Sequence, residues 1–509
     1  MPASRQAPPP SAKRPDLIAA LRLALQAASF THEHVKASMR SDDSLQIPTA
    51  RAPLLLQELG GGPLATLIAL FLAYVPVPTV FATRALAPLT LQQAEALGII
   101  GVGRSHVHPQ VQIQPTPEGW FASDILDESP EFVMGVSDST RMLAHTTIRR
   151  RSESALDMGT GRGYHAILAA PHAQRVVGVD INARAIAFAH FNAALNSCQN
   201  VEFRTGNMFE PVAGQTFDLI VSNPPFVISP DKAFVYRDSG LGGDEVSRTL
   251  IQTLPRYLTP NGVGHVTFNW VHQPNEDWDA PLRQWIAGSG CDAWFIREAS
   301  YDPLAYAMLW NQRLLVDATN KQRYAGTIER WTRYFAQAGI RAIGYGLAIL
   351  RSRPNAAEHR VRSEDMPPSA TSARMPSVAW PQSSIGADLD RLIAADDQLE
   401  ALNDAALLEQ RIAGVEGAHI QQMLRWRDGA YRLVDASLIS ERGLRPIADL
   451  DPASAVLLRN IDGQQTIRTL LDATGKALGR QALDLLAFRE SNLSVIRELI
   501  SHGFLELTG

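Results

Sequence analysis

The chain contains very little cysteine: Cys198 and Cys291 are the only two among 509 residues. Two thiols cannot build a disulfide framework, so a reducing, cytoplasmic compartment is expected. The cysteines and histidines also lack the close spacing that a metal site needs, so we expect no bound metal. Both cysteines are expected to be small buried residues of the core.

A long apolar run is also missing. The most apolar stretch, residues 64–75, is shorter than the about 20 residues that span a bilayer, and it predicts a buried helix. The first ten residues are rich in proline and have no apolar segment of the kind found in a signal peptide. We therefore expect no membrane association, and a disordered tail over residues 1–14.

Positive charge is not in excess. Lysine and arginine number 47 against 52 aspartates and glutamates, which gives a net charge of −5. This balance argues against an extended basic face for duplex DNA, but it permits a local basic patch. The length suits about three domains, which we expect at 15–128, 129–353 and 381–509, with a proline- and serine-rich linker over 354–380.

Three β-rich runs stand out in the middle of the chain, and each ends in polar residues. They lie at residues 154–163, 175–180 and 217–226. The first runs into a glycine turn, the second ends in a carboxylate and the third ends in Asn-Pro-Pro-Phe. Parallel strands with polar carboxyl ends predict an open α/β sheet whose ligand site lies along that edge.

The glycine turn has the spacing Asp157-x-Gly159-x-Gly161-x-Gly163. Glycine lets the backbone turn tightly and lets a ligand lie against it. Asp180, at the end of the next strand, has a carboxylate that can accept hydrogen bonds from both hydroxyls of a ribose. A nicotinamide dinucleotide site uses a similar turn, so the turn alone leaves that alternative open.

The Asn-Pro-Pro-Phe motif occupies residues 223–226. Read alone, it is equally an ordinary strand-ending turn, since Asn-Pro favours turns. At the end of its strand, and together with Asp157, the glycines and Asp180, it resembles the Asn-Pro-Pro-Phe/Tyr amino-methyltransferases. These are class I S-adenosylmethionine-dependent methyltransferases, and they include release-factor glutamine methyltransferases and small-subunit rRNA guanine methyltransferases.

The resemblance implies a seven-stranded, mostly parallel Rossmann-like core and S-adenosylmethionine as cofactor. The family usually has an acid where Asn207 stands, although an asparagine oxygen can still accept a hydrogen bond from the adenine amino group. The residues expected to bind the cofactor are Asp157, Gly159, Thr160, Gly161, Gly163, Asp180, Ile181, Asn207, Met208 and Asn223.

The resemblance also implies the catalytic residues. Asn223 and the Pro224 carbonyl would accept hydrogen bonds from a planar NH2 group, and the Phe226 ring would stack on the group that carries it. Such catalysis is positioning rather than strong general base chemistry. The substrate side is expected to include Pro225, Tyr236 and Gly243, because the polar loop 236–245 resembles the corresponding segment of the release-factor enzymes.

The segment 133–143 precedes the first strand of the core. In the family, a segment at this place folds over the cofactor, and Ser139 or Thr140 is a candidate cap for its helix. A plain linker helix is the alternative.

The two flanks are harder to interpret. Helices followed by a hairpin from strands 107–113 and 119–125 suggest a winged-helix-like N-terminal domain, and a helix–glycine–strand ending at 496–504 suggests another at the C-terminus. Winged helices bind nucleic acid, but the lack of basic excess favours a platform for substrate or for a homodimer.

The acceptor stays open at this point. A protein glutamine amide and a nucleobase both suit the motif, while Val227, where guanine-methylating relatives often have histidine, counts against that branch. A second hypothesis is a methyltransferase for a small metabolite or natural-product peptide that uses its terminal domains for dimerisation or substrate docking. A third is a cofactor-binding, non-catalytic adaptor.

Overall fold

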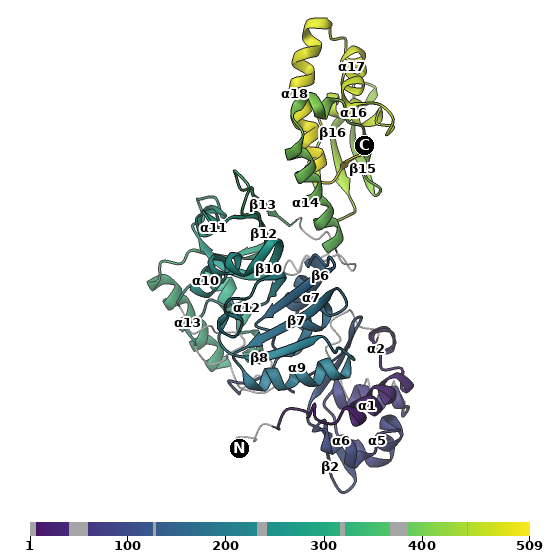
Figure 1. Ribbon diagram of the computed structural model, residues 1–509, viewed down its shortest axis with the longest axis vertical. Helices are drawn as coiled ribbons and strands as arrows, with labels where there is room; N and C mark the ends of the chain where they lie inside the picture. The colour runs from purple at the N-terminus through teal and green to yellow at the C-terminus, as the bar shows by residue number, and fades with distance from the viewer. Residues whose placement is uncertain are drawn as a thin grey trace. The chain divides into compact units, whose positions relative to one another are not determined.

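The computed structural model describes residues 7–39, 60–125, 129–231, 242–315, 321–366, 385–444 and 446–508. The chain divides into two compact units (Figure 1). The first unit comprises residues 1–144 and 150–365, and the second comprises residues 145–149 and 366–509.

The first unit is built on an eight-stranded sheet with the order β13-β11-β12-β10-β9-β6-β7-β8. Only β12 runs antiparallel to its neighbours. The strands are β6 (Ser152–Met158), β7 (Ala173–Asp180), β8 (Val201–Thr205), β9 (Phe217–Ser222), β10 (Leu258–His272), β11 (Cys291–Tyr301), β12 (Ala342–Ser352) and β13 (Val361–Asp365).

The mostly parallel, Rossmann-like sheet confirms the predicted fold class, but the count of seven strands was wrong. The eighth strand, β13, lies inside the segment 354–380 that was expected to be a linker. Its sequence, Val-Arg-Ser-Glu-Asp, is largely polar because β13 is an edge strand whose residues stay partly exposed. An apolar run of the kind that marks buried strands is therefore absent there.

Helices connect these strands and cover the sheet. One face packs against α10 and α11 through Leu250, Ile251, Leu282 and Trp285, opposite Val266 and Phe268 of β10. The helices of this part are α7 (Asp138–Thr146), α8 (Tyr164–Ala169), α9 (Ala183–Leu195), α10 (Glu245–Thr253), α11 (Ala280–Ile286), α12 (Pro303–Trp310) and α13 (Lys321–Gln337).

Helices α12 and α13 contribute aromatic side chains to one buried cluster. Tyr306, Trp331 and Phe335 are fully buried in one cluster with Phe226 and Ile343.

The N-terminal elements share a hydrophobic core with the sheet domain. Leu17 and Leu21 of α1 lie in one buried cluster with Phe188 and Phe191 of α9. The elements are α1 (Pro15–Ala27), α2 (His32–Met39), α4 (Pro63–Phe71), β1 (Val77–Pro78), α5 (Thr79–Leu86), α6 (Leu91–Ala96), β2 (Ile100–Val102), β3 (His106–Pro109), β4 (Gln112–Thr116) and β5 (Gly119–Ser123).

Two predictions for this region need correction. The expected strand 107–113 is two strands, since β3 pairs with β1 and β2 whereas β4 pairs with β5. The expected disordered tail is ordered from residue 7 on, because the Ser11 N–H donates to the Leu97 carbonyl (2.9 Å) and the Ala7 carbonyl accepts from Arg184 (2.7 Å).

The second unit combines helices with short sheets. Its end, α18 followed by Gly503 at φ +77° and β18, confirms the predicted helix–glycine–strand order. The elements are α14 (Gly386–Ala401), α15 (Asp404–Leu408), β14 (Ile412–Gly414), β15 (Ala418–Arg427), β16 (Ala430–Ser440), β17 (Ile447–Asp449), α16 (Pro452–Arg459), α17 (Ile467–Ala477), α18 (Ala482–Ser501) and β18 (Leu505–Leu507).

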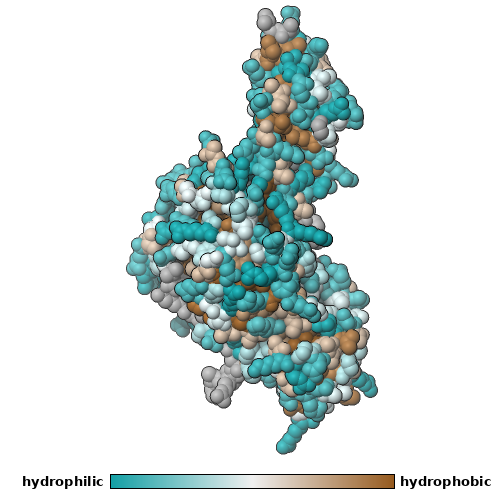
Figure 2. Space-filling model, viewed as in Figure 1, coloured by the Kyte–Doolittle hydropathy of each residue, from teal (hydrophilic) through white to brown (hydrophobic). Residues whose placement is uncertain are grey.

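The surface on the viewed face is largely hydrophilic, with hydrophobic residues in separate patches (Figure 2). Within the described ranges, no helix combines the length and the apolar character needed to cross a bilayer. Among those same residues, no group of three or more His, Cys, Asp or Glu side chains could hold a metal ion. Cys291 is buried and Cys198 is half-buried, and both are free thiols.

Candidate active site at the carboxyl edge of the sheet

The strand order reverses between β6 and β9, and this switch point brings the two sequence motifs together. The chain runs from β6 outward to β7 and β8, then returns to β9 on the other side of β6. Ligands of open α/β sheets bind at such a point. A Cβ atom added to Gly159, after β6, would lie 3.9 Å from the Asn223 carbonyl oxygen and 3.9 Å from Pro224 Cα, after β9.

The three glycines of the turn adopt left-handed backbone conformations, at φ +72° for Gly159, +55° for Gly161 and +86° for Gly163. Their surroundings differ. A Cβ on Gly163 would come within 3.1 Å of Ala189 Cβ and 3.2 Å of Ala189 Cα, so this glycine permits close packing on α9. A Cβ on Gly161 would meet no described atom within 4 Å. The open side of the turn is therefore at Gly161.

Asp157 is the second-to-last residue of β6 and is almost fully buried. Its Oδ2 accepts hydrogen bonds from Thr160 Oγ1 (2.6 Å) and the Ala166 backbone N–H (2.8 Å), which fixes the turn to the start of α8. Its Oδ1 is buried and has no hydrogen-bond partner among the described residues. Burial raises the pKa of Asp157 to about 7, against the lowering effect of the two donors.

Asp180 ends β7 and holds the turn from the other side. Its Oδ2 accepts from the Gly161 N–H (2.8 Å) and its Oδ1 accepts from the Asn182 N–H (2.8 Å). Burial raises the pKa of this carboxyl group. Each oxygen keeps a second lone pair, so the predicted contact with ribose hydroxyls stays possible. Ile181 beside it is an apolar side chain that is 58% exposed.

Asn207 and Met208 follow β8. Asn207 is exposed, and its Nδ2 makes one long contact (3.4 Å) with Glu210 Oε1. Met208 has a left-handed backbone at φ +44° and is partly buried. Both lie after a strand end that neighbours Asp180, which is where the resemblance expected them, and their contacts with the cofactor stay predictions.

The Asn223 side-chain amide follows β9 and has partners on both ends. Thr267 Oγ1, on β10, donates to Oδ1 (2.7 Å), while Nδ2 donates to Ser139 Oγ (3.2 Å) and Thr140 Oγ1 (3.3 Å), at the start of α7. Sequence reasoning gave Thr267 no role, because its only signal is a hydroxyl at a buried strand position.

Pro224 and Phe226 form a tight turn, in which the Pro224 carbonyl accepts from the Phe226 N–H (2.8 Å). The Phe226 ring is only 7% exposed and packs near Trp310 and Tyr345, with ring centroids 6.1 and 5.5 Å away. It is thus part of an aromatic cluster, and its stacking on an acceptor stays a prediction. Pro225 is partly exposed.

Of the other expected substrate residues, Tyr236 lies outside the described residues. Gly243, the second described residue after the gap at 232–241, lies close to the same aromatic cluster, since its N–H donates to the Tyr334 hydroxyl (3.0 Å). The loop predicted to line the substrate side therefore returns beside the residues that surround Phe226.

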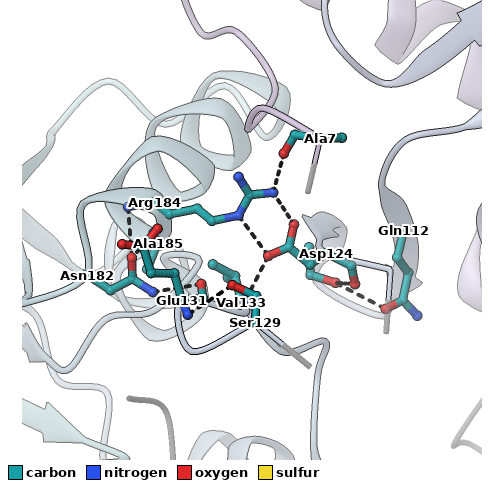
Figure 3. Close-up of polar contacts among 10 residues, drawn as sticks. Ala7, Gln112, Asp124, Ser129, Glu131, Val133, Asn182, Arg184 and Ala185 are labelled. Carbon is teal, nitrogen blue, oxygen red and sulfur yellow. Dashed lines mark hydrogen bonds and ion pairs between the residues drawn. The ribbon is translucent and has the colours of Figure 1, made fainter. Parts of the chain in front are cut away.

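The segment before α7 is tied to both motifs. The Asn182 side chain donates to the Glu131 carbonyl (2.9 Å), and the Val133 N–H donates to Asp124 Oδ2 (2.9 Å). Arg184 pairs with Asp124 through two hydrogen bonds and reaches Ala7 with a third, as Figure 3 shows.

Further along this segment, Arg162 of the glycine turn donates to the Met134 carbonyl. The segment then enters α7, whose Ser139 and Thr140 contact Asn223. Residues 129–140 thus run from the start of α9 past the glycine turn to the Asn-Pro-Pro-Phe motif, and the expectation that this segment folds over the cofactor stays a prediction.

Known proteins are similar to this chain mainly in the region that contains the candidate site. A methyltransferase-domain family matches residues 150–339, and a domain family of unknown function, DUF7059, matches residues 46–110. A release factor glutamine methyltransferase from Geobacter sulfurreducens is 37% identical over 139 residues, which are 24% of this chain and 48% of that protein.

Two further relatives are also named as methyltransferases. A protein from Methanocaldococcus jannaschii, named as a protein N5-glutamine methyltransferase, is 35% identical over 142 residues, 26% of this chain and 70% of that protein. A ribosomal RNA small subunit methyltransferase C from Alcanivorax borkumensis is 33% identical over 108 residues, 21% of this chain and 30% of that protein.

The chain spans about half the length of the first curated relatives that it matches, between 41% and 49%. The methyltransferase-domain match begins just before β6 and extends beyond β11, so it contains the strands that carry both motifs. Since the match to the archaeal relative also covers more than two thirds of that protein, this chain belongs to the class I S-adenosylmethionine-dependent methyltransferases.

Proposed function

We propose that this protein transfers a methyl group from S-adenosylmethionine to the nitrogen of a planar NH2 group, which releases S-adenosylhomocysteine and one proton of that nitrogen to solvent, and that the acceptor is a glutamine side-chain amide of a protein. The observation that carries the proposal is the hydrogen-bonding capacity of the acceptor motif. Asn223 Oδ1 uses one lone pair for Thr267, and the Pro224 oxygen uses one for the Phe226 N–H. One lone pair remains on each oxygen, which matches the two N–H groups of an NH2.

The cofactor suits the residues on the other side of the site. The open face of Gly161, the exposed Ile181 and the free lone pairs of Asp180 suit a nucleoside lying across the turn. The unpartnered Asp157 Oδ1 suits a positively charged group. When bound, S-adenosylmethionine supplies an electrophilic methyl group on its sulfonium.

The chain's own contribution to the reaction is orientation. Two fixed acceptors hold both N–H bonds of the NH2 group, so its nitrogen lone pair points out of the plane of those bonds. Prolines on the motif stiffen the backbone that carries the acceptors. A correctly placed nucleophile gains much of its rate from this loss of freedom, without a strong base.

A protein acceptor has support from the relatives and from the second unit. Release factor, ribosomal protein uL3 and archaeal relatives are all named as glutamine methyltransferases, and Val227 departs from the guanine-methylating pattern. In addition, the β15–β16 hairpin exposes Trp426 and Tyr431 at 60% and 68%. Exposed aromatic residues are enriched at protein–protein interfaces.

The roles of the flanks follow from this proposal. We propose that the winged-helix-like N- and C-terminal regions serve as platforms for the acceptor. Homodimer formation and a cytoplasmic location stay predictions, as does the alternative of a small-metabolite or natural-product peptide acceptor.

The test is incubation of the full chain with methyl-labelled S-adenosylmethionine and a fractionated cell extract. Label in protein, recovered as N5-methylglutamine after digestion, is the expected result. Label in RNA would replace the glutamine acceptor by a nucleobase, and label in small molecules would favour the metabolite alternative. Binding of S-adenosylhomocysteine without transfer to any fraction would favour the non-catalytic adaptor.

A further inference from the structure

The Asn223 amide works as an acceptor only in one of its two orientations. Rotating the amide by half a turn about its last bond exchanges Oδ1 and Nδ2, which have nearly the same shape. In the wrong orientation two N–H donors would face the NH2 group of the substrate, and donor would meet donor. Packing cannot choose between the two orientations, so hydrogen bonds have to do so.

The distances around Asn223 indicate how the choice is made. The 2.7 Å contact with Thr267 Oγ1 has the length of an O–H···O hydrogen bond, whereas the contacts of 3.2 and 3.3 Å with Ser139 and Thr140 suit an N–H donor. Thr267 is fully buried on the face of β10 opposite Val266 and Phe268, which pack into the core against α10 and α11. Its hydroxyl is therefore held at one place.

We infer that Thr267, together with Ser139 and Thr140, is a set of positioning residues that fixes the orientation of the Asn223 amide. This inference rests on the proposed function. Thr267 donates its proton to Oδ1 and leaves the other lone pair of that oxygen for the acceptor nitrogen. Ser139 and Thr140 take the two N–H groups of the amide, so that neither N–H is presented to the substrate.

Ser139 and Thr140 are themselves held in place by Ser137. Ser137 Oγ lies 3.0 Å from Ser139 Oγ and 2.9 Å from Thr140 Oγ1, and it accepts from the Thr140 backbone N–H at 3.3 Å. These hydroxyls sit at the start of α7, directly after the segment that Arg162 ties to the glycine turn. The cofactor side and the acceptor side of the site thus share one structural support.

A purely structural role for Thr267 is the competing explanation, since a buried hydroxyl needs a partner wherever it lies. The two explanations differ in what changes when the hydroxyl is removed. A structural role predicts lower stability with unchanged transfer by the folded protein. The positioning role predicts slower transfer with unchanged affinity for S-adenosylhomocysteine.

The experiment compares Thr267→Val, which keeps the shape and removes the hydroxyl, with Thr267→Ser, which restores it. Thr259→Val is the matched control, because Thr259 is also on β10 and donates at 2.7 Å to Asp218, away from the motif. Full-length proteins are assayed for methyl transfer to the extract fraction that the unmodified protein labels. Affinity for S-adenosylhomocysteine and thermal midpoints are measured alongside.

We expect Thr267→Val to slow transfer by about tenfold to a hundredfold, the range for misplaced reactants, with the S-adenosylhomocysteine affinity changed by less than about twofold. Thr267→Ser should recover most of the rate, and Thr259→Val should keep it. Full activity in Thr267→Val, a Thr267→Ser protein as slow as Thr267→Val, or equal losses in Thr259→Val would each overturn the inference.

If Thr267→Val does not fold, the double variant Ser139→Ala/Thr140→Val tests the other end of the amide by the same readouts, and full transfer there would also overturn the inference. Failure of the proposed function looks different. In that case the unmodified protein neither binds S-adenosylhomocysteine nor transfers label to any fraction, and the inference falls with it.

Discussion

The proposed methyl-donor side of the site, around Asp157 and Asp180, and the proposed methyl-acceptor side, around Asn223, are built in different ways. On the donor side, Asp157 and Asp180 accept hydrogen bonds from backbone N–H groups and one hydroxyl at most 19 positions away, and glycines within one turn set the conformation. On the acceptor side, the partners of Asn223 lie 44, 83 and 84 positions away along the chain. A local motif therefore specifies the first, whereas the second exists only after the sheet has formed.

Replacing Asn223 should have the largest effect, because it should lower methyl transfer and leave the affinity for S-adenosylhomocysteine unchanged. Asn223→Ala removes the amide oxygen and should reduce methyl transfer on the order of a hundredfold to a thousandfold, the usual cost of losing one preorganised hydrogen-bonding group. The affinity for S-adenosylhomocysteine, measured by calorimetry, should stay near that of the unmodified protein. A large loss of that affinity would mean that the two sides are not separate.

Two glycine substitutions divide the donor side itself. Gly161→Ala and Gly163→Ala both force alanine into a left-handed backbone, which costs about 1–2 kcal/mol. Only Gly161 faces open space, while a Cβ on Gly163 meets Ala189. We expect Gly161→Ala to weaken S-adenosylhomocysteine binding by about tenfold or more, and Gly163→Ala mainly to lower the thermal midpoint. Equal effects of the two variants on binding would contradict the assignment of the open face.

The buried carboxylate of Asp157 should make stability depend on pH. Burial raises its pKa to about 7, from about 3.9 in an unfolded chain. Between these values the folded protein holds a proton that the unfolded chain has lost, so the free energy of unfolding falls as pH rises. Thermal midpoints should decrease by at least a few degrees from pH 5 to pH 8.

The isosteric variant Asp157→Asn is the control for this effect, because it cannot ionise. Its midpoint should change less over the same pH range than that of the unmodified protein. Parallel curves for the two proteins would assign the pH dependence to other groups.

The smallest effect is expected at Asn207. Its side chain is exposed and makes one 3.4 Å contact, so Asn207→Ala should change stability by less than about 0.5 kcal/mol. Its effect on cofactor binding should be modest, within about threefold. A large loss of S-adenosylhomocysteine affinity would show that the asparagine replaces the usual acid of the family fully.

The sequence was most informative where chemistry and backbone geometry coincide. The Asp-led glycines, Asp180 and Asn223 were predicted at one sheet edge, and the structure places all of them there. Strand β13 was missed because an exposed edge strand carries no apolar pattern. The split of residues 107–113 into β3 and β4 was missed because periodicity does not reveal which strand a residue pairs with.

Side-chain orientation was the other limit. The resemblance assigned Phe226 a stacking role but could not predict that its ring packs near Trp310 and Tyr345, which lie more than 80 positions away along the chain. Thr267 could not be recognised as a functional candidate from the sequence either. Its meaning depends on β10 lying beside β9, a neighbour relation that no local pattern encodes.

The contact between Arg184 and the Ala7 carbonyl bears on where an affinity tag should be placed. Arg184 stands in the first turn of the helix that follows Asp180 and Ile181, so a change at the N-terminus alters the surroundings of a guanidinium near the loop that we propose to bind the cofactor. An affinity tag at that end, or a deletion of the first ten residues, is therefore a variable in every ligand titration. A tag at the other terminus is the safer choice for such measurements.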